Sequence, residues 1–360
     1  MEIKNSFSNK NLSMSHTLII SNIKNKIKNF QNLETILFGL PNGSILVGGF
    51  IRDLILDRLN PYPDIDIVIP NNSLEIGKNI AEKFSGKFLI LDQERNIVRI
   101  IFRNFTLDIA NQTHELLAED LKSRDFTINS IGFSLDNGKL LDPANGINDL
   151  NNLLLNSYYS ENLLNDPLRI LRCFRFVSEL NFHIEPNIVK FIKLNKSHLK
   201  IVSVERIQYE LKKIVQGKEA FKTIHFLNEL KIFDWIQSYE QNQSNSLLWL
   251  TFENFLQDEI DNFFQIAYLK ELLQEPVLTK FKFSKSDTLA INSLRRWSEK
   301  LEEKSILNFT EIERFNLHKD LEMILPAFIL YLPKQFHKEW LRRWRNKKDK
   351  LFHPRNYING

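Results

Sequence analysis

The chain has 360 residues, more than a single hydrophobic core usually supports, so two or three domains are expected. Hydrophobic residues make up 43% and charged residues 26%, which excludes an intrinsically disordered chain, and no apolar run is long enough to span a membrane. The net charge of +4 permits a polyanionic partner without requiring one, and the single cysteine, Cys173, excludes an internal disulfide. We therefore expect a globular cytoplasmic protein with several domains.

Residues 1–43 combine a polar start with one amphipathic helix, because Ile19, Ile23, Ile27 and Phe30 follow the spacing of one helix face. From 44 to 142, short β-rich runs (SILV, DIDIVI, KFLIL, NIVRIIF, FTLDIA and GFSL) are broken by Gly, Asn and Asp. Helical spacing interrupts them over 50–59 and 74–84. We expect residues 44–142 to form an α+β head on a mixed sheet.

After the turn-rich stretch DPANGINDL the pattern becomes helical almost to the end. Helices are expected over 161–180, 186–196, 203–216 and 218–230, and weaker helical segments continue to 345. Pro167 stands where a first-turn proline is tolerated, with Asn165 or Asp166 as the N-cap. A helical neck over 143–235 and a helical body and tail over 236–360 follow.

Asp64 and Asp66, in the run DIDIVI, are two residues apart. On a strand this spacing places both carboxylates on one face, while the isoleucines fill the other. Adjacent carboxylates repel each other unless a cation lies between them, and two-metal phosphoryl transfer requires such a site. If the pair stood alone, two solvent-facing side chains would be the better explanation.

The preceding run SILVGGFIRDLIL reads as a strand, the glycines Gly48 and Gly49, and a helix. Bare backbone at the start of a helix lets a phosphate approach closely. Arg52, in the first turn of that helix, can donate charge-assisted hydrogen bonds to the same phosphates. The alternative is a tight turn with a surface ion pair between Arg52 and Asp53. The DxD pair that follows favours a nucleotide-binding site.

Further motifs extend this pattern over about residues 44–235: after VGGFIRD and DIDIVI come SRDFTINSIGF, LLDPANGINDL, NDPLRILRCFRF and VSVERIQYELKKI. In order and spacing they resemble the head and neck motifs of bacterial tRNA nucleotidyltransferases and poly(A) polymerases. The resemblance implies a template-independent RNA nucleotidyltransferase whose head has the DNA polymerase beta type of fold. It also implies that Asp64 and Asp66 bind magnesium.

The resemblance assigns roles to several other residues of the head. Asp108, in LDIA, fits the third acidic position on a neighbouring strand, where it would position or deprotonate the RNA 3′ hydroxyl. A partly exposed structural aspartate is the alternative. The match at RDFTIN gives Arg124, Asp125 and Asn129 as contacts to the ribose and triphosphate. A structural network would satisfy buried side chains of these types as well.

Base selection is expected in NDPLRILR. Asp166, Arg169 and Arg172 recur at every third position, so on a helix Asp166 and Arg169 would be neighbours. A carboxylate can accept from the exocyclic amino group of C or A, and a guanidinium can donate to a ring nitrogen or to O2 of C. In the family this segment reads the base, and Asp166 and Arg169 match it. A capping aspartate with an i,i+3 ion pair is the alternative.

Glu205 and Arg206 match the last motif of the family, and we expect them to form a buried ion pair that supports the base-reading helix. Nearer the C-terminus, KEWLRRWRNKKDK mixes tryptophans with basic residues in a way that suits phosphate contact with stacking. Its candidate RNA-binding residues are Arg342, Arg343, Arg345, Lys347 and Lys348. A solvated basic helix with its tryptophans in the core is an equal alternative.

The sequence departs from the family pattern in three places. Asn165 stands where a Glu usually precedes Asp166, and Ser123 replaces the first of two arginines before Asp125. The connection from Asp108 to Arg124 is also shorter than the flexible loop of full CCA-adding members. In this respect the chain resembles the CC-adding subset.

The sequence therefore predicts an enzyme that adds cytidines, with the terminal adenosine left open, to the tRNA 3′ end from CTP and ATP with Mg²⁺, releasing pyrophosphate. A poly(A) polymerase with the same motifs is the nearest alternative. A non-catalytic RNA-binding protein of the same fold and a small-molecule nucleotidyltransferase are more distant ones. Nothing in the sequence indicates the oligomeric state.

Overall fold

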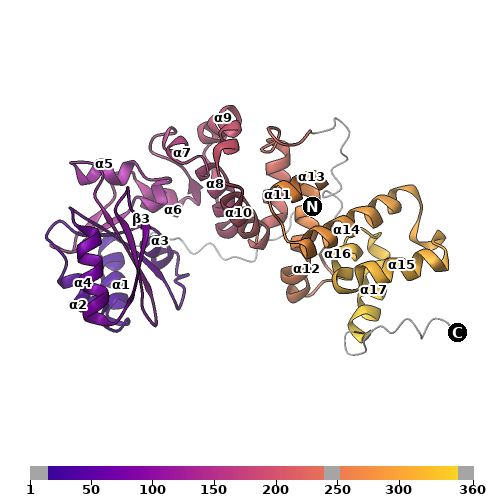
Figure 1. Cartoon of the computed structure of the whole chain (residues 1–360), viewed down its shortest axis with the longest axis horizontal. Helices are drawn as coiled ribbons and strands as arrows, with labels where there is room; N and C mark the ends of the chain where they lie inside the picture. Colours follow the sequence, from indigo (N-terminus) through magenta and orange to yellow (C-terminus); the bar gives the residue numbers. More distant parts are fainter. Residues whose placement is uncertain (1–14, 239–251, 348–360) are drawn as a thin grey trace. The chain divides into compact units, whose positions relative to one another are not determined.

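The computed structural model describes residues 15–238 and 252–347 (Figure 1). They fall into two compact units. The first consists of the residues up to Asp166 together with Phe182–Val189, and the second consists of Pro167–Asn181 together with the residues from Lys190 onward. The first unit is α+β and the second helical, which confirms the predicted fold class. The division at 43, 142 and 235 remains a prediction. Within the described ranges, no helix is both long and apolar enough to cross a membrane.

The first unit is built on a mixed sheet. Its strands lie in the order β3 (Lys87–Asp92), β4 (Ile97–Ile101), β5 (Thr106–Asn111), β2 (Asp64–Ile69), β1 (Ile45–Val47), β6 (Gly132–Ser134) and β7 (Leu140–Leu141). β2 and β5 run parallel, and the other neighbours run antiparallel. The β-rich runs of the sequence are thus β1 to β6.

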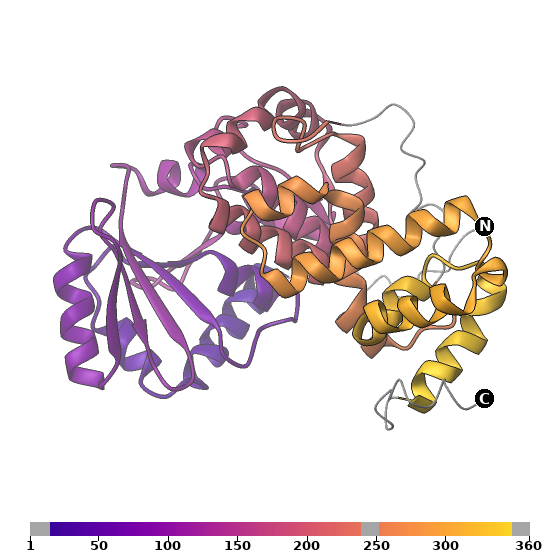
Figure 2. The ribbon, with the colours of Figure 1, turned by 45° about the vertical axis from the view of Figure 1, so that its right-hand side comes forward.

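One face of the sheet is apolar and covered by helices. Ile65 and Ile67 of β2 point to it and are 0% and 1% exposed. Helix α4 (Ser73–Phe84) lies so close to it that a β carbon on Gly77 would be 2.6 Å from Val98. Three other helices complete this layer, α1 (His16–Lys28), α2 (Leu33–Phe38) and α3 (Gly49–Ile55), and Figures 1 and 2 show them beside the strands.

The opposite face is covered only in part. Helix α5 (Leu117–Lys122) places Leu121 in a small cluster with Ile45, Val47 and Val68. Residues of one strand alternate between the faces, so Asp64 and Asp66 project from this same side of β2. The polar part of the face next to this cluster carries the candidate site.

The stretch DPANGINDL contains a helix, α6 (Gly146–Asn151), which its composition did not predict. The carboxylate of Asp142 begins it by accepting hydrogen bonds from the backbone N–H groups of Gly146 and Ile147, at 2.6 and 2.9 Å. Thr127, in the 3₁₀ turn η1 (Thr127–Asn129), donates its hydroxyl to Asp149 at 2.6 Å. α6 therefore supports the turn that carries Asn129.

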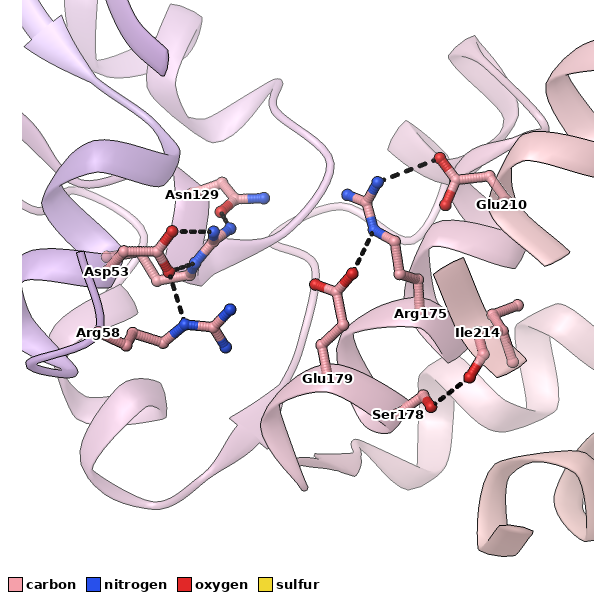
Figure 3. A network of polar contacts seen from close by, with 9 residues as sticks. Asp53, Arg58, Asn129, Arg175, Ser178, Glu179, Glu210 and Ile214 are labelled. Atoms are coloured by element: carbon pink, nitrogen blue, oxygen red, sulfur yellow. Dashed lines mark hydrogen bonds and ion pairs between the residues drawn. The ribbon is translucent and has the colours of Figure 1, made fainter. Parts of the chain in front are cut away.

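The first unit also contains α7 (Asn162–Asn165) and a parallel pair of short strands, β8 (Leu154–Leu155) and β9 (His183–Ile184). Helix α9 (Pro186–Asn195) follows β9 and continues into the second unit. The other helical elements belong to the second unit: α8 (Arg169–Leu180), η2 (Lys196–Ile201), α10 (Val204–Gln216), α11 (Ala220–Glu229), α12 (Gln257–Leu272), α13 (Glu275–Lys280), α14 (Lys285–Glu303), η4 (Ile306–Asn308), α15 (Glu311–Leu321), η5 (Glu322–Ile324), α16 (Leu325–Ile329) and α17 (Lys334–Lys347). α8 packs against α10, where the hydroxyl of Ser178 donates to the carbonyl of Ile214 at 2.6 Å (Figure 3).

Candidate active site

Three carboxylates share the open face of the sheet. Asp64 and Asp66 alternate with buried isoleucines on β2, and the register places Asp108 of β5 directly opposite Asp66. Asp64 is exposed, whereas Asp66 and Asp108 are half-buried. The acidic residues predicted from the motifs are therefore brought together on neighbouring strands.

Gly48 forms the turn between β1 and α3, next to these carboxylates. Its φ of 77° and ψ of −145° lie in a region that residues with a β carbon rarely adopt. A β carbon at this position would also be 2.6 Å from Oδ2 of Asp66. Both the backbone conformation and the close carboxylate therefore require glycine.

Arg99 of β4 is a site residue that sequence reasoning missed. It lies opposite Asp108, and its Nε and Nη2 atoms donate to the two oxygens of that carboxylate at 2.8 and 2.7 Å. This hydrogen bonding, together with the negative charges of Asp108, Asp64 and Asp66, raises the pKa of Arg99 above its ordinary value. The available signal was a lone charged residue within the apolar run of β4.

The predicted nucleotide-binding residues around Arg52 form one network. The guanidinium of Arg52 donates to both oxygens of Asp53, each at 2.9 Å, and to Oδ1 of Asn129 at 2.7 Å. Asn129 in turn donates through Nδ2 to Asp125 at 3.0 Å, so the orientation of its amide follows from its partners. Asp53 also pairs with Arg58 (Figure 3). Arg52 is 8% exposed, so this is not the surface pair considered as the alternative.

Arg124 directly precedes Asp125 in the chain. Its Nε is buried without a hydrogen-bond partner in the described part of the chain. The backbone around it is held by Asn162 of α7, whose amide donates to the carbonyls of Lys122 and Arg124 at 2.7 and 2.9 Å. Asn162 was not predicted, because its effect depends on a contact between segments far apart in sequence. A buried donor without an acceptor is available for a bound phosphate.

The connection between β5 and α5, residues 112–116, is short and held by side chains. Asp120 of α5 accepts from the backbone N–H and the hydroxyl of Thr113, at 2.8 and 2.7 Å. Gln112 donates to the carbonyl of Glu115 at 3.0 Å. These contacts hold the connection that the sequence predicts to be shorter than the loop of full CCA-adding members.

The structure corrects the prediction for residues 161–180, which form two helices and not one. α7 ends at Asn165, Asp166 is extended with φ −148° and ψ 100°, and α8 begins only at Arg169. Asp166 therefore precedes the helix, and the argument that Asp166 and Arg169 are neighbours on one helical face is wrong. Arg169 and Arg172 do lie one turn apart on α8, and both are half-buried.

The expected buried pair of Glu205 and Arg206 is also wrong. Both residues are exposed, and Glu205 pairs with Lys282 at 2.6 Å. Glu210, one turn further along α10 and 2% exposed, takes the supporting role. It pairs with Arg175 of α8 at 3.3 Å, and Figure 3 shows Arg175 between Glu210 and Glu179. Burial raises the pKa of Glu210, an effect that the charge of Arg175 opposes.

The basic residues near the C-terminus differ in their surroundings. Arg345 donates through Nε and Nη2 to the carboxylate of Glu259, which is 3% exposed, at 2.7 and 2.8 Å. Arg343 pairs with Glu339 of its own helix, and Arg342 is exposed. Lys347 is the last residue of α17 and Lys348 lies outside the described residues. Arg345 thus has a structural partner, while Arg342 faces solvent.

Asp64 and Asp66 are the candidate ligands of a metal ion. Over residues 15–238 and 252–347, no group of three or more His, Cys, Asp or Glu side chains is placed to hold a metal ion. Asp108 is turned toward Arg99, which leaves Asp64 and Asp66 as the pair on β2. Proteins usually bind Mg²⁺ through one or two carboxylates, and substrate phosphates and water supply its other ligands. The donor set fits such an ion.

Comparisons with known proteins extend over most of the chain. Residues 44–156 match the poly A polymerase head domain, and residues 181–239 match the probable RNA and SrmB-binding site of polymerase A. The CC-adding tRNA nucleotidyltransferase of Synechocystis sp. is 28% identical over 350 residues, which is 89% of this chain and 84% of that protein. A CC-adding tRNA nucleotidyltransferase of Shouchella clausii is 35% identical over 185 residues, or 51% of this chain and 47% of its own length.

The fold has a counterpart among solved structures. The Thermotoga maritima CCA-adding enzyme complexed with tRNA matches 96% of this chain and 90% of its own chain, with a TM-score of 0.73 and 23% identity. Head and RNA-binding family models in the same order, relatives over most of the length and a shared fold agree with one another. The chain belongs to the family of bacterial tRNA nucleotidyltransferases and poly(A) polymerases.

Proposed function

We propose that this protein extends the 3′ end of tRNA without a template, adding cytidines from CTP, with addition of the terminal adenosine from ATP left open. The observation that carries the proposal is the row of Asp64, Asp66 and Asp108 beside the glycine turn at Gly48. Relatives named as CC-adding and CCA-adding enzymes support tRNA as the substrate. A cytoplasmic location follows from a tRNA substrate.

Enzymes of this family generally use a divalent metal ion. We propose Mg²⁺, held by Asp64 and Asp66. When bound, it would lower the pKa of the RNA 3′ hydroxyl and neutralise charge on the triphosphate. The oxygen of that hydroxyl attacks the α-phosphorus of the nucleotide, and pyrophosphate leaves. Asp108, which Arg99 orients, is proposed to accept a hydrogen bond from the hydroxyl.

The surrounding residues bind and orient the nucleotide. Gly48 and Gly49 let the triphosphate approach the backbone, and Arg124 offers its buried Nε to a phosphate oxygen. Arg52 and Asp53, fixed by Asn129 and Asp125, line the same part of the head and complete the contacts to phosphate and ribose. Because Arg52, Asp53, Asn129 and Asp125 hold one another, these side chains are organised before the nucleotide arrives.

Base selection is assigned to Asp166, Arg169 and Arg172. Asp166 has an extended backbone and directly precedes Pro167 and Leu168, after which α8 begins. Arg169 and Arg172 lie in the first turn of α8, whose position is fixed by the buried pair of Arg175 and Glu210. A carboxylate and a guanidinium together can distinguish the amino group and ring atoms of C from those of U.

Replacement of the metal ligands tests the proposal. Asp64→Asn and Asp66→Asn should each lower nucleotide incorporation by several orders of magnitude, while tRNA binding changes little, because the amide removes a metal ligand but preserves shape. Asp57→Asn is the matched control, since Asp57 is an exposed aspartate of the same unit. The assay uses tRNA transcripts ending before CCA, after C and after CC, with each labelled nucleotide offered separately.

Each alternative predicts a different result in that assay. A poly(A) polymerase would give long adenosine tails on any 3′ end, and a non-catalytic RNA-binding protein would give no extension. Near-normal turnover in either metal-ligand variant would refute the assignment of Asp64 and Asp66.

A further inference from the structure

Arg99 lies in a row with Asp108 and Asp66 across three neighbouring strands. The register pairs Arg99 with Asp108 and Asp108 with Asp66, so all three side chains project from one face of the sheet. Asp64 shares that face. Beyond Arg99 the next strand presents Leu89, so β3 supplies no opposite charge at this point of the register. The arrangement places one fixed cation at the end of a row of carboxylates.

The contact between Arg99 and Asp108 determines where that carboxylate points. Both oxygens of Asp108 accept from the planar guanidinium, on the side of β5 that faces β4 and not β2. The side chain of Asp108 is 15% exposed and that of Arg99 is 34% exposed, so solvent screens the pair only in part. Each oxygen keeps one further lone pair, enough for a hydrogen bond from a hydroxyl.

The charge of Arg99 acts on the other carboxylates as well. After the hydrogen bond and charge of Asp108, the charges of Asp64 and Asp66 add to the rise in the pKa of Arg99. The guanidinium is therefore within electrostatic range of both residues and stays charged at any working pH. The positive charge of Arg99 in turn repels a divalent cation near Asp64 and Asp66.

We propose that Arg99 is a positioning residue that holds Asp108 out of the metal-ligand set and lowers the affinity of Asp64 and Asp66 for free divalent cations. This inference rests on the proposed metal site. Its consequence is that the metal ion enters mainly as a complex with the nucleoside triphosphate, whose phosphates complete its ligands. Asp108 then remains available for the RNA hydroxyl.

Binding of Mn²⁺ to the full chain without nucleotide tests the proposal. Arg99→Met keeps the length of the side chain but removes its charge, so the dissociation constant for Mn²⁺ should fall roughly three- to tenfold, as expected for one charge several ångströms away in a partly hydrated site. With CTP present, the dissociation constant should change less than about twofold, because the phosphates then dominate the ligand set. Free Mn²⁺ is measured by electron paramagnetic resonance.

Arg95→Met is the matched control. Arg95 pairs with Asp92 in the turn between β3 and β4, its side chain is 68% exposed, and its loss changes the formal charge equally. Its Mn²⁺ affinity should stay near that of the wild type. If Arg99→Met does not fold, as judged by circular dichroism, Arg99→Gln replaces it, since the amide can still donate to Asp108; the same tightening is expected.

The outcomes separate this inference from the proposed function. If Arg99→Met binds Mn²⁺ as tightly as the wild type or more weakly, while Asp66→Asn abolishes binding, the role of Arg99 is refuted and the metal site stands. Mn²⁺ binding that Asp66→Asn leaves intact would instead refute the metal site itself. Equal tightening in Arg99→Met and Arg95→Met would show a general charge effect and overturn the assignment of Arg99.

Discussion

Oδ2 of Asp66 lies 2.6 Å from the point where a β carbon on Gly48 would stand. Gly48→Ala should therefore displace this carboxylate and strain the backbone by about 1–3 kcal/mol. Because a small displacement of a reacting group is costly, we expect roughly a hundredfold loss of incorporation. Steady-state kinetics and thermal unfolding measure the two effects.

Gly138→Ala is the control for Gly48→Ala. Gly138 also has a positive φ, of 65°, but its β carbon would meet the flexible end of Lys24 and make an ordinary contact with Phe133 at 3.9 Å. This variant should lose stability and keep its activity per folded molecule. A Gly48 variant that kept full activity would show that the turn does not position Asp66.

Arg169→Ala should lose discrimination against UTP and GTP more than it loses stability. A bidentate contact to a base edge contributes roughly 1–3 kcal/mol, or about ten- to more than a hundredfold in selectivity. The measurement compares kcat/KM for CTP and UTP on a tRNA ending before CCA. If Arg169→Ala misfolds but its folded fraction retains selectivity, the residue has only a structural role.

Arg175→Ala, on the same helix, should do the opposite. It leaves the carboxylate of Glu210 buried without its partner, so the free energy of unfolding should fall by about 3 kcal/mol or more while selectivity is kept. Urea unfolding measures the loss.

Asp149→Asn should alter the pH dependence of stability. Burial, followed by the nearby charge of Asp142, raises the pKa of Asp149 above its ordinary 3.8, so the native protein holds this proton more tightly than the unfolded chain does. The resulting stabilisation is complete below pH 3.8 and is lost as pH rises through the higher folded value. The amide still accepts from Thr127 but does not titrate.

We therefore expect Asp149→Asn to be as stable as the wild type or more stable at pH 8. Its free energy of unfolding should also decrease less than that of the wild type between pH 4 and 8. Thermal unfolding across that range measures the difference, with the exposed Asp57→Asn as control. An identical slope in Asp149→Asn and the wild type would show that this carboxylate titrates alike in the folded and unfolded states.

Arg345→Ala and Arg342→Ala should separate stability from RNA binding. Loss of Arg345 leaves Glu259 buried without its ion pair, so the free energy of unfolding should fall by about 1–3 kcal/mol. The salt dependence of tRNA binding should stay the same. If Arg342 contacts a phosphate, its loss should lower the slope of log K against log salt concentration by about 0.7–0.9.

The protein should stop after adding CC. Switching from C to A requires the base-reading residues to be displaced as the RNA end grows. The connection of residues 112–116 is short and held by Asp120, so it supplies no long loop that could displace them. A tRNA ending in CC should stay unextended with ATP, so a separate A-adding enzyme would be needed in the same cell. Efficient addition of A by this protein alone, at low enzyme concentration, would overturn the CC-only prediction and leave the family unchanged.

Local sequence signals predicted the strands, most of the helices and the faces of β2, because alternation and helical spacing depend on neighbouring residues. They failed for the pairing of Arg99 with Asp108, since a cross-strand partner depends on the register between segments joined by a turn. The break at Asp166 has a local cause: the ring of Pro167 disfavours a helical conformation in the residue before it. Glu210 was missed because motif matching favoured Glu205, although the helical spacing of α10 places Glu210 on the buried side.

The connection between β5 and α5, which side-chain hydrogen bonds hold in place, is also a point at which proteins of this fold can come to differ in specificity. It is held across its length by Thr113 at its start and Asp120 of α5. Extra residues inserted between them would leave both elements in place, and each doubling of the loop length would cost only about 0.6 kcal/mol of closure entropy. An insertion at this point would therefore cost little closure entropy. Related chains could gain or lose a mobile loop at this point without rebuilding the head.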